Sequence, residues 1–135
     1  MLTLKRSIRL KDQILLPNGD RVNVDLDVEA HQMQLNKAWN DVILAAQDWM
    51  KDIRNAENEA LRRNFYAKYE ALLRIVLGKG GLQRALAAYD GNIAELCTML
   101  DSWVGTDVQQ KIHEASAKLV ERRKASARKQ LRRRK

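Results

Sequence analysis

The chain has 135 residues, 45% of them hydrophobic and 31% charged, which is typical of one soluble globular domain and too short for a separate catalytic domain. No run reaches the roughly 18 apolar residues of a membrane-spanning helix, and the single cysteine excludes an intramolecular disulfide and a cysteine-pair metal site. The net charge of +8 is concentrated at one end, because residues 118–135 hold ten Lys or Arg and one acid, whereas residues 1–117 hold 15 basic and 16 acidic residues.

Apolar residues alternate with polar ones over residues 3–28, which predicts two β-strands joined by a turn. A three-residue loop at residues 17–19 pairs Ile14 with Val22 and keeps the apolar side chains on one face. Asp12 is the one polar residue expected on that face. An isolated two-stranded hairpin is only marginally stable, so its apolar face must pack on the helices or on a neighbouring subunit.

Residues 30–77 predict one long helix or two nearly collinear helices, because their apolar residues recur at helical spacing. The apolar stripe thins at residues 54–60, where two asparagines compete for backbone hydrogen bonds, and any bend is expected there. A continuous helix would be roughly 70 Å long, so we expect it either to fold back or to need a partner. Most of the stripe is interpreted as core.

The sequence Gly-Lys-Gly-Gly at residues 78–81 predicts the end of this helix and a turn. A short helix at residues 82–89 and a further helix capped by Asn92 are expected next. Gly105 is expected to end that helix and Thr106 to cap the last one. The predicted fold is therefore α+β and mainly α: an N-terminal β-hairpin, a long helix, and a small helical bundle with a basic C-terminal helical extension.

The predicted organisation is a β-hairpin at residues 1–29, a helical body at residues 30–120 and a basic tail at residues 121–135. Apolar periodicity ends after Val120 while helix propensity stays high, so we expect a solvated helical extension. Its cations suit nucleic-acid phosphates or an acidic protein, and it has no aromatic residue for base stacking. The cations given this role are Arg122, Arg123, Lys124, Arg128, Lys129, Arg132, Arg133, Arg134 and Lys135.

No catalytic or metal-binding pattern is recognisable in the sequence. His31 and His113 lack metal-ligand spacing, and Ser116 near His113 lacks an orienting acid. We therefore expect a non-enzymatic protein with no cofactor and no small-molecule substrate. Cys97, among apolar neighbours, is interpreted as a small buried hydrophobic residue.

Aromatic residues of the long helix are the candidate protein-binding residues, because aromatic side chains contribute strongly to interfaces. Among the three tryptophans, at least two are expected to pack in the core, and an exposed one would mark an interface. The candidates are Trp39, Trp49, Phe65 and Tyr69.

A resemblance rests on the order of the elements and on the glycine junction. The long helix ends in Leu73-Arg74-Ile75-Val76-Leu77-Gly78-Lys79-Gly80-Gly81, and Leu82-Gln83-Arg84-Ala85-Leu86, Tyr89-Asp90-Gly91-Asn92-Ile93-Ala94-Glu95-Leu96 and a charged helix follow. Over residues 30–120 this layout resembles the small phage and prophage proteins of the tail assembly chaperone type, which help a tape measure protein assemble into the tail tube. The resemblance implies that the apolar helix face and the hairpin edge bind a tape-measure-like helical partner or sibling subunits until assembly.

Two other functions stay open at this point. One is a nucleic-acid-associated protein that uses its basic tail. The other is a virion structural subunit whose hairpin completes a neighbouring sheet. Residues 1–6 lead into strand alternation rather than into a signal-peptide core. The expected location is the cytoplasm of a bacterial host cell, with the virion as the alternative, and no membrane partner is expected.

Overall fold

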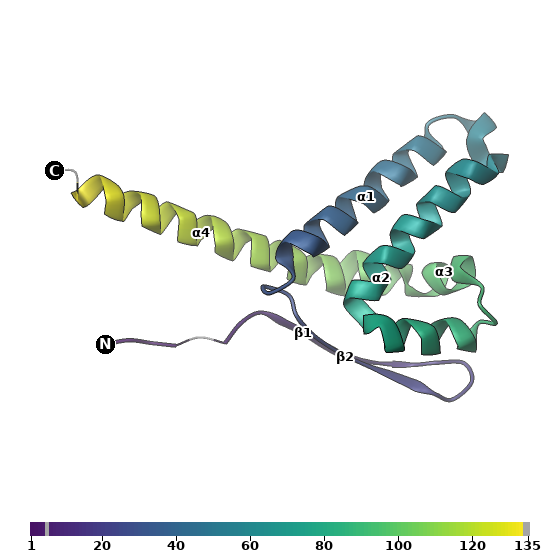
Figure 1. Ribbon diagram of the computed structural model, residues 1–135, viewed down its shortest axis with the longest axis horizontal. Helices are drawn as coiled ribbons and strands as arrows, with labels where there is room; N and C mark the ends of the chain where they lie inside the picture. Colours follow the sequence, from purple (N-terminus) through teal and green to yellow (C-terminus); the bar gives the residue numbers. More distant parts are fainter. Residues whose placement is uncertain (5, 134–135) are drawn as a thin grey trace.

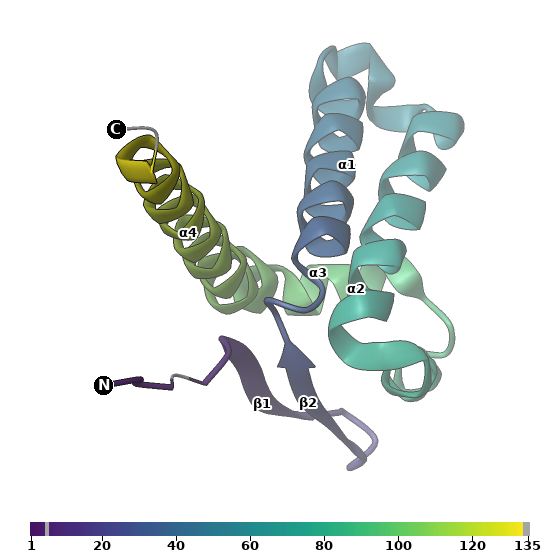
Figure 2. The same ribbon diagram turned by 60° about the vertical axis from the view of Figure 1, so that its left-hand side comes forward.

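A computed structural model describes residues 1–4 and 6–133 of the chain. The fold is mainly helical, with 72% of the described residues in helices and an antiparallel β-hairpin at the N-terminus, which confirms the predicted fold class. In Figure 1 the hairpin lies on one side of a pair of antiparallel helices, and a long C-terminal helix projects beyond them. Figure 2 shows the same projecting C-terminal helix from a second direction.

Strands β1 (Arg9–Leu15) and β2 (Arg21–Asp27) pair in the predicted register, with Ile14 opposite Val22. The backbone N–H of Leu16 donates to the carbonyl oxygen of Asp20 over 2.8 Å, which closes the three-residue loop. Gly19 in this loop has φ +86°, a left-handed conformation that glycine adopts without steric cost. The turn and the alternation of buried and exposed residues on β2 therefore confirm the sequence interpretation.

The prediction of one long helix or two nearly collinear helices is wrong, whereas the expected alternative, a chain that folds back near residues 54–60, is confirmed. Helix α1 (Gln32–Met50) and helix α2 (Glu59–Ala88) run antiparallel side by side, with a 3-10 helix at Ile53–Glu57 between them. The chain reverses where the apolar stripe thins, and two side chains that flank the 3-10 helix stabilise the reversal. Asp52 accepts a hydrogen bond from the N–H of Arg54, and Asn58 caps α2 by accepting from the N–H of Leu61. Folding back lets each apolar stripe cover the other.

Helix α2 contains the predicted break at Gly78, whose φ of 75° and ψ of 162° are not helical. The chain turns there, so that residues 79–88 form a short helix with a different direction (Figure 1). This segment lies against the hairpin, since a Cβ at Gly81 would be only 3.0 Å from Cγ1 of Val22. Arg84 in the same segment pairs with Asp20 at the hairpin turn. The hairpin thus packs on helices of its own chain.

The expected end of a helix at Gly105 and the expected cap at Thr106 are wrong. Helix α3 (Ile93–Trp103) continues through a π-helical segment, Val104–Val108, into helix α4 (Gln109–Arg133) without leaving helical conformation. The hydroxyl of Thr106 donates to the carbonyl oxygen of Ser102 over 2.7 Å instead of capping. The extra residue of a π-helical turn keeps apolar residues of both helices on the core side, as buried Val104 and Val108 show.

The core lies between the apolar face of the hairpin and helices α1 to α4. Asp12, the polar residue on that face, is exposed and accepts a hydrogen bond of 2.8 Å from Nε1 of Trp103. Leu10, Val22, Val24, Leu26 and Val28 on this face are buried as expected, whereas Leu4 is 83% exposed. The largest fully buried side chains are Leu35, Leu72, Leu73, Leu96, Val22, Val28, Val104 and Val108.

Candidate functional site

Four aromatic side chains meet where α1 ends and α2 begins. Trp49 comes from the last turn of α1, and Phe65, Tyr66 and Tyr69 come from α2. The Trp49 ring centroid lies 5.4 Å from that of Phe65 and 5.9 Å from that of Tyr66, and Phe65 lies 5.8 Å from Tyr69. These are favourable aromatic pair geometries. We call these four residues the aromatic cluster.

Helix geometry explains how the cluster forms. Tyr69 follows Phe65 by four residues and Tyr66 by three, so both side chains neighbour Tyr69 on the surface of α2. The chain reversal after Met50 brings Trp49 to them. Three of the four predicted binding residues, Trp49, Phe65 and Tyr69, are therefore brought together.

Trp39 does not belong to the cluster. It lies ten residues earlier on α1, about 15 Å along the helix axis, and packs against the core together with Trp103. Two of the three tryptophans thus pack on the core, as predicted, while Trp49 is outside it.

Tyr66 is a member of the cluster that sequence reasoning missed. Its signals in the sequence are its position beside Phe65 and the arginine one helical turn earlier. In the structure the guanidinium carbon of Arg62 lies 5.4 Å from the centroid of the Tyr66 ring, a cation–π geometry.

Tyr69 anchors the cluster to α3. Its ring is buried, and its hydroxyl donates a hydrogen bond of 2.9 Å to a carboxylate oxygen of Asp101. Burial raises the pKa of the Tyr69 hydroxyl far above its ordinary value, and the neighbouring Asp101 raises it further. The hydroxyl therefore stays protonated and acts as a structural donor rather than as an acid or base.

An uncovered apolar rim surrounds the cluster at the tip of the helical hairpin. The side chain of Met50 is 73% exposed and that of Ile53 is 91% exposed. They help to line a hollow of about 400 Å³ with Trp49, Asp52 and Ala56. A second hollow of about 280 Å³ is also lined by Trp49 and Met50, together with the rest of the aromatic cluster and Cys97, Thr98 and Asp101. We call Met50, Ile53 and the aromatic cluster the apolar tip.

The indole nitrogen of Trp49 is buried and has no hydrogen-bond partner within residues 1–4 and 6–133. A buried donor without an acceptor costs about 1–3 kcal/mol relative to a paired one. Among the described residues, the one buried side-chain polar atom without a partner thus belongs to Trp49, which lines both hollows of the apolar tip.

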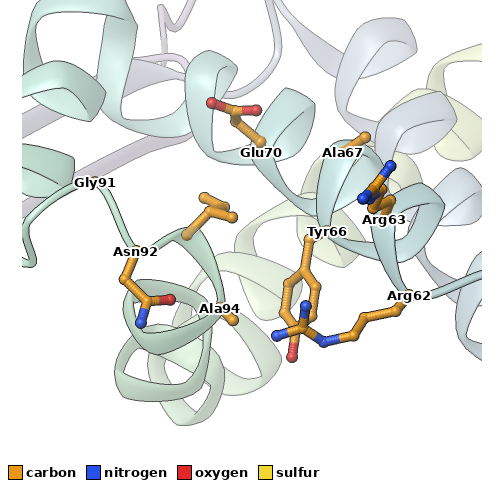
Figure 3. A pocket seen from close by; sticks show the side chains of 9 residues that line it. Arg62, Arg63, Tyr66, Ala67, Glu70, Gly91, Asn92 and Ala94 are labelled. Atoms are coloured by element: carbon orange, nitrogen blue, oxygen red, sulfur yellow. The ribbon is translucent and has the colours of Figure 1, made fainter. Parts of the chain in front are cut away.

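A third hollow, of about 330 Å³, lies between α2 and the start of α3. In Figure 3 the Arg62 side chain lies across the Tyr66 ring on one side of this hollow, and Asn92 lies on the other side. The Asn92 side chain accepts a hydrogen bond of 3.1 Å from the N–H of Glu95, so it serves as the predicted cap of α3. Arg62 and Asn92 therefore stabilise the fold through these contacts, and the two side chains form no nucleophile–base pair.

The basic tail forms a second candidate surface. Helix α4 extends to Arg133, and every residue from Val120 to Arg133 is exposed, so the structure has the expected helical extension. Its base is held by Glu29, whose side chain is only 16% exposed and lies 2.8 Å from Nζ of Lys118 and 3.5 Å from a guanidinium nitrogen of Arg122. Arg122 therefore has a structural partner. Arg134 and Lys135 lie outside the described residues.

The remaining candidates for chemistry have structural roles. Cys97 is buried, as predicted, and burial, with smaller contributions from Glu70 and Asp101, raises the pKa of its thiol to about 12. The imidazole Nδ1 of His31 lies 2.9 Å from the carbonyl oxygen of Asp27. Across residues 1–4 and 6–133, no three His, Cys, Asp or Glu side chains are grouped closely enough to hold a metal ion.

Within the part of the chain that the structure describes, no helix has both the length and the apolar character needed to cross a membrane. Comparisons of this chain with protein-family models, with curated proteins and with solved structures found no match.

Proposed function

We propose that this chain is a non-enzymatic assembly protein that covers an amphipathic helix of a partner with its apolar tip. The observation that carries the proposal is the exposure of Met50 and Ile53 directly beside the aromatic cluster. Exposed apolar residues above a cluster of large aromatic side chains are typical of binding hot spots.

The shape of the apolar tip favours an amphipathic helix as the partner. Such a helix presents apolar side chains at intervals of three and four residues, and two of them would enter the two hollows that Trp49 and Met50 line. Binding would bury the side chains of Met50 and Ile53, each contributing on the order of 1.5–3 kcal/mol when fully buried.

In this proposal the protein acts in phage or prophage tail assembly, in the cytoplasm of the bacterial host, as a tail assembly chaperone-like protein. Its partner would be a tape-measure-like protein, whose apolar helical surface would otherwise be exposed before assembly. The resemblance in element order and at the glycine junction supports this role. The antiparallel helical hairpin supports it as well, because it places the apolar tip at one end of the molecule (Figure 1).

A virion structural subunit is a second candidate, favoured by the N-terminal residues. The side chains of Met1, Leu2 and Leu4 are exposed, and they lie on the segment that precedes β1. Apolar side chains on an extended segment next to a sheet suit pairing with a second copy. Light scattering after size exclusion at high salt separates the candidates, because a structural subunit would form stable higher oligomers without any partner.

The test of the assembly role uses a labelled, leucine-rich amphipathic helical peptide as the probe. Its binding is measured by fluorescence anisotropy at high salt, where an apolar interface persists and charge contacts weaken. The variant combines Met50→Gln and Ile53→Gln. The control is Met33→Gln, which removes a methionine that is 86% exposed at the opposite end of α1.

We expect the double variant to bind the peptide at least about tenfold more weakly, since about 1.4 kcal/mol corresponds to a factor of ten. The Met33→Gln control should bind as the unmodified protein does. Equal binding by all three proteins, or no binding by any of them, would overturn the assembly role of the apolar tip.

A further inference from the structure

We propose that the exposed part of α4, residues 121–133, is a binding element for double-stranded DNA that contacts the phosphates on both sides of a major groove. We call these residues the basic extension. The inference is independent of the apolar tip, which lies at the far end of the helical hairpin (Figure 1).

The first argument is the availability of the cations. Seven Lys or Arg side chains lie in the basic extension, and only Arg122 and Lys124 have an acidic side chain within ion-pair distance among residues 1–4 and 6–133. The other five, which no carboxylate of the described residues neutralises, are Arg123, Arg128, Lys129, Arg132 and Arg133.

The second argument is the arrangement of the cations around the helix axis. Successive residues of an α-helix differ by about 100° in direction, so Arg122, Lys129 and Arg133 form one line, while Arg123, Lys124, Arg128 and Arg132 point in other directions. Val120, Ala127 and Leu131 form one apolar strip along the helix. Seen down the helix axis, this strip lies between Arg123 and Lys124. The basic extension is therefore cationic on nearly all sides.

This arrangement distinguishes duplex DNA from other acidic partners. A membrane-surface helix buries a wide apolar face, which this strip does not provide. An acidic helix would lie against one face and leave the cations on the other sides without partners. A major groove about 12 Å wide admits an α-helix and presents phosphates on both of its sides. The deep, narrow major groove of double-stranded RNA does not admit one.

The placement of the helix allows such an approach. Both views show the basic extension projecting clear of α1 and the β-hairpin (Figures 1 and 2). The ion pairs of Glu29 with Lys118 and Arg122 hold its base against the body. The described extension is about 20 Å long, which is close to six base pairs of duplex at about 3.4 Å each.

The chemistry predicts binding that depends on salt and hardly on base sequence. The cations are Lys and Arg, which neutralise phosphates and release counterions. If about five phosphates are contacted, log affinity falls with log salt with a slope near −4.5, which is a loss of roughly 500-fold between about 50 and 200 mM salt.

The experiment measures anisotropy of a labelled short DNA duplex with the full chain and two triple variants. The first variant carries Arg128→Gln, Lys129→Gln and Arg132→Gln. The second, the control, carries Lys11→Gln, Lys51→Gln and Lys79→Gln, which removes the same charge from exposed positions of the body.

We expect the tail variant to bind at least about tenfold more weakly at low salt and to lose close to three units of salt slope, about one for each cation removed. The body variant should keep the slope of the unmodified protein. Equal weakening of both variants, or no binding of duplex DNA at about 50 mM salt, would overturn the proposal.

Two further probes identify a different partner class. Tighter binding of duplex RNA than of duplex DNA would exclude the major-groove geometry. Binding of polyglutamate but not of DNA would assign the basic extension to an acidic protein. Peptide binding by the apolar tip at high salt should be the same for the tail variant and the unmodified protein, so failure of one proposal is distinguishable from failure of the other.

Discussion

Replacing Gly78 by alanine should destabilise the fold, whereas the same replacement at Gly80 should stabilise it. Gly78 has φ 75° and ψ 162°, a region of backbone space that is essentially restricted to glycine. Gly80 lies two residues later in the helical segment of α2 and shows no positive φ. A Cβ at either position would meet no atom within 4 Å. The two substitutions thus differ in backbone strain and not in packing.

The magnitude follows from two opposing contributions. A residue with a Cβ in the Gly78 conformation is strained by on the order of 1–3 kcal/mol. Alanine also has fewer unfolded conformations than glycine, which favours folding by about 0.4–1 kcal/mol at both positions. The contribution of the unfolded chain is common to both variants. The difference between their free energies of unfolding therefore isolates the strain at residue 78, about 1–3 kcal/mol.

Urea unfolding followed by far-ultraviolet circular dichroism measures this difference. The free energy of unfolding falls by about 2 kcal/mol per molar urea. A difference of about 2 kcal/mol in this free energy therefore separates the unfolding midpoints of the two variants by about 1 M urea. Equal midpoints for the two variants would refute the reasoning, because they would mean that residue 78 does not hold a glycine-only conformation. A rise in helical signal for Gly78→Ala would then indicate that α2 continues straight through the junction.

Three further predictions concern single side chains. Tyr69→Phe should lower the free energy of unfolding by about 1 kcal/mol, because it removes the donor to Asp101, and urea unfolding measures the loss. Lys118 holds the pKa of Glu29 below its ordinary value of 4.5, so Glu29 stabilises the fold above that pH. At neutral pH the unmodified protein should therefore have a higher free energy of unfolding than Glu29→Gln, and this difference should shrink as the pH falls through the lowered pKa. Unfolding curves at several pH values measure it. The Cys97 thiol, with its pKa raised to about 12, should react with a thiol reagent far more slowly in the native protein than in urea.

The first two of these predictions each have a control variant in the same chain. Tyr66→Phe removes a hydroxyl with no hydrogen bond to the described residues and should leave stability nearly unchanged. Glu57→Gln removes an exposed carboxylate with no ion pair among them. A loss for Tyr66→Phe equal to that for Tyr69→Phe, a pH-independent effect of Glu29→Gln, or rapid native labelling of Cys97 would each contradict the corresponding argument.

The local features of this fold could be predicted from the sequence because short-range interactions determine them. The period-two pattern and the turn at residues 17–19 predicted the strand register, since a slip of one residue would expose every apolar side chain of the hairpin. Asn92 was predicted as a cap because its side chain bonds to a backbone N–H only three residues away. The exposure of the basic extension followed from its lack of apolar periodicity.

Only the tertiary structure decided how these elements are placed relative to one another. An apolar stripe is compatible with a straight helix that has a partner and with a helix pair that folds back, so α1 and α2 could not be distinguished from collinear helices. Gly105 and Thr106 signal a helix end locally, but burial of Val104 and Val108 continues the helix through a π-helical turn. The aromatic cluster depends on the chain reversal, because Trp49 meets its partners across some sixteen residues of sequence. Long-range packing, which the local pattern does not contain, therefore determined the candidate site.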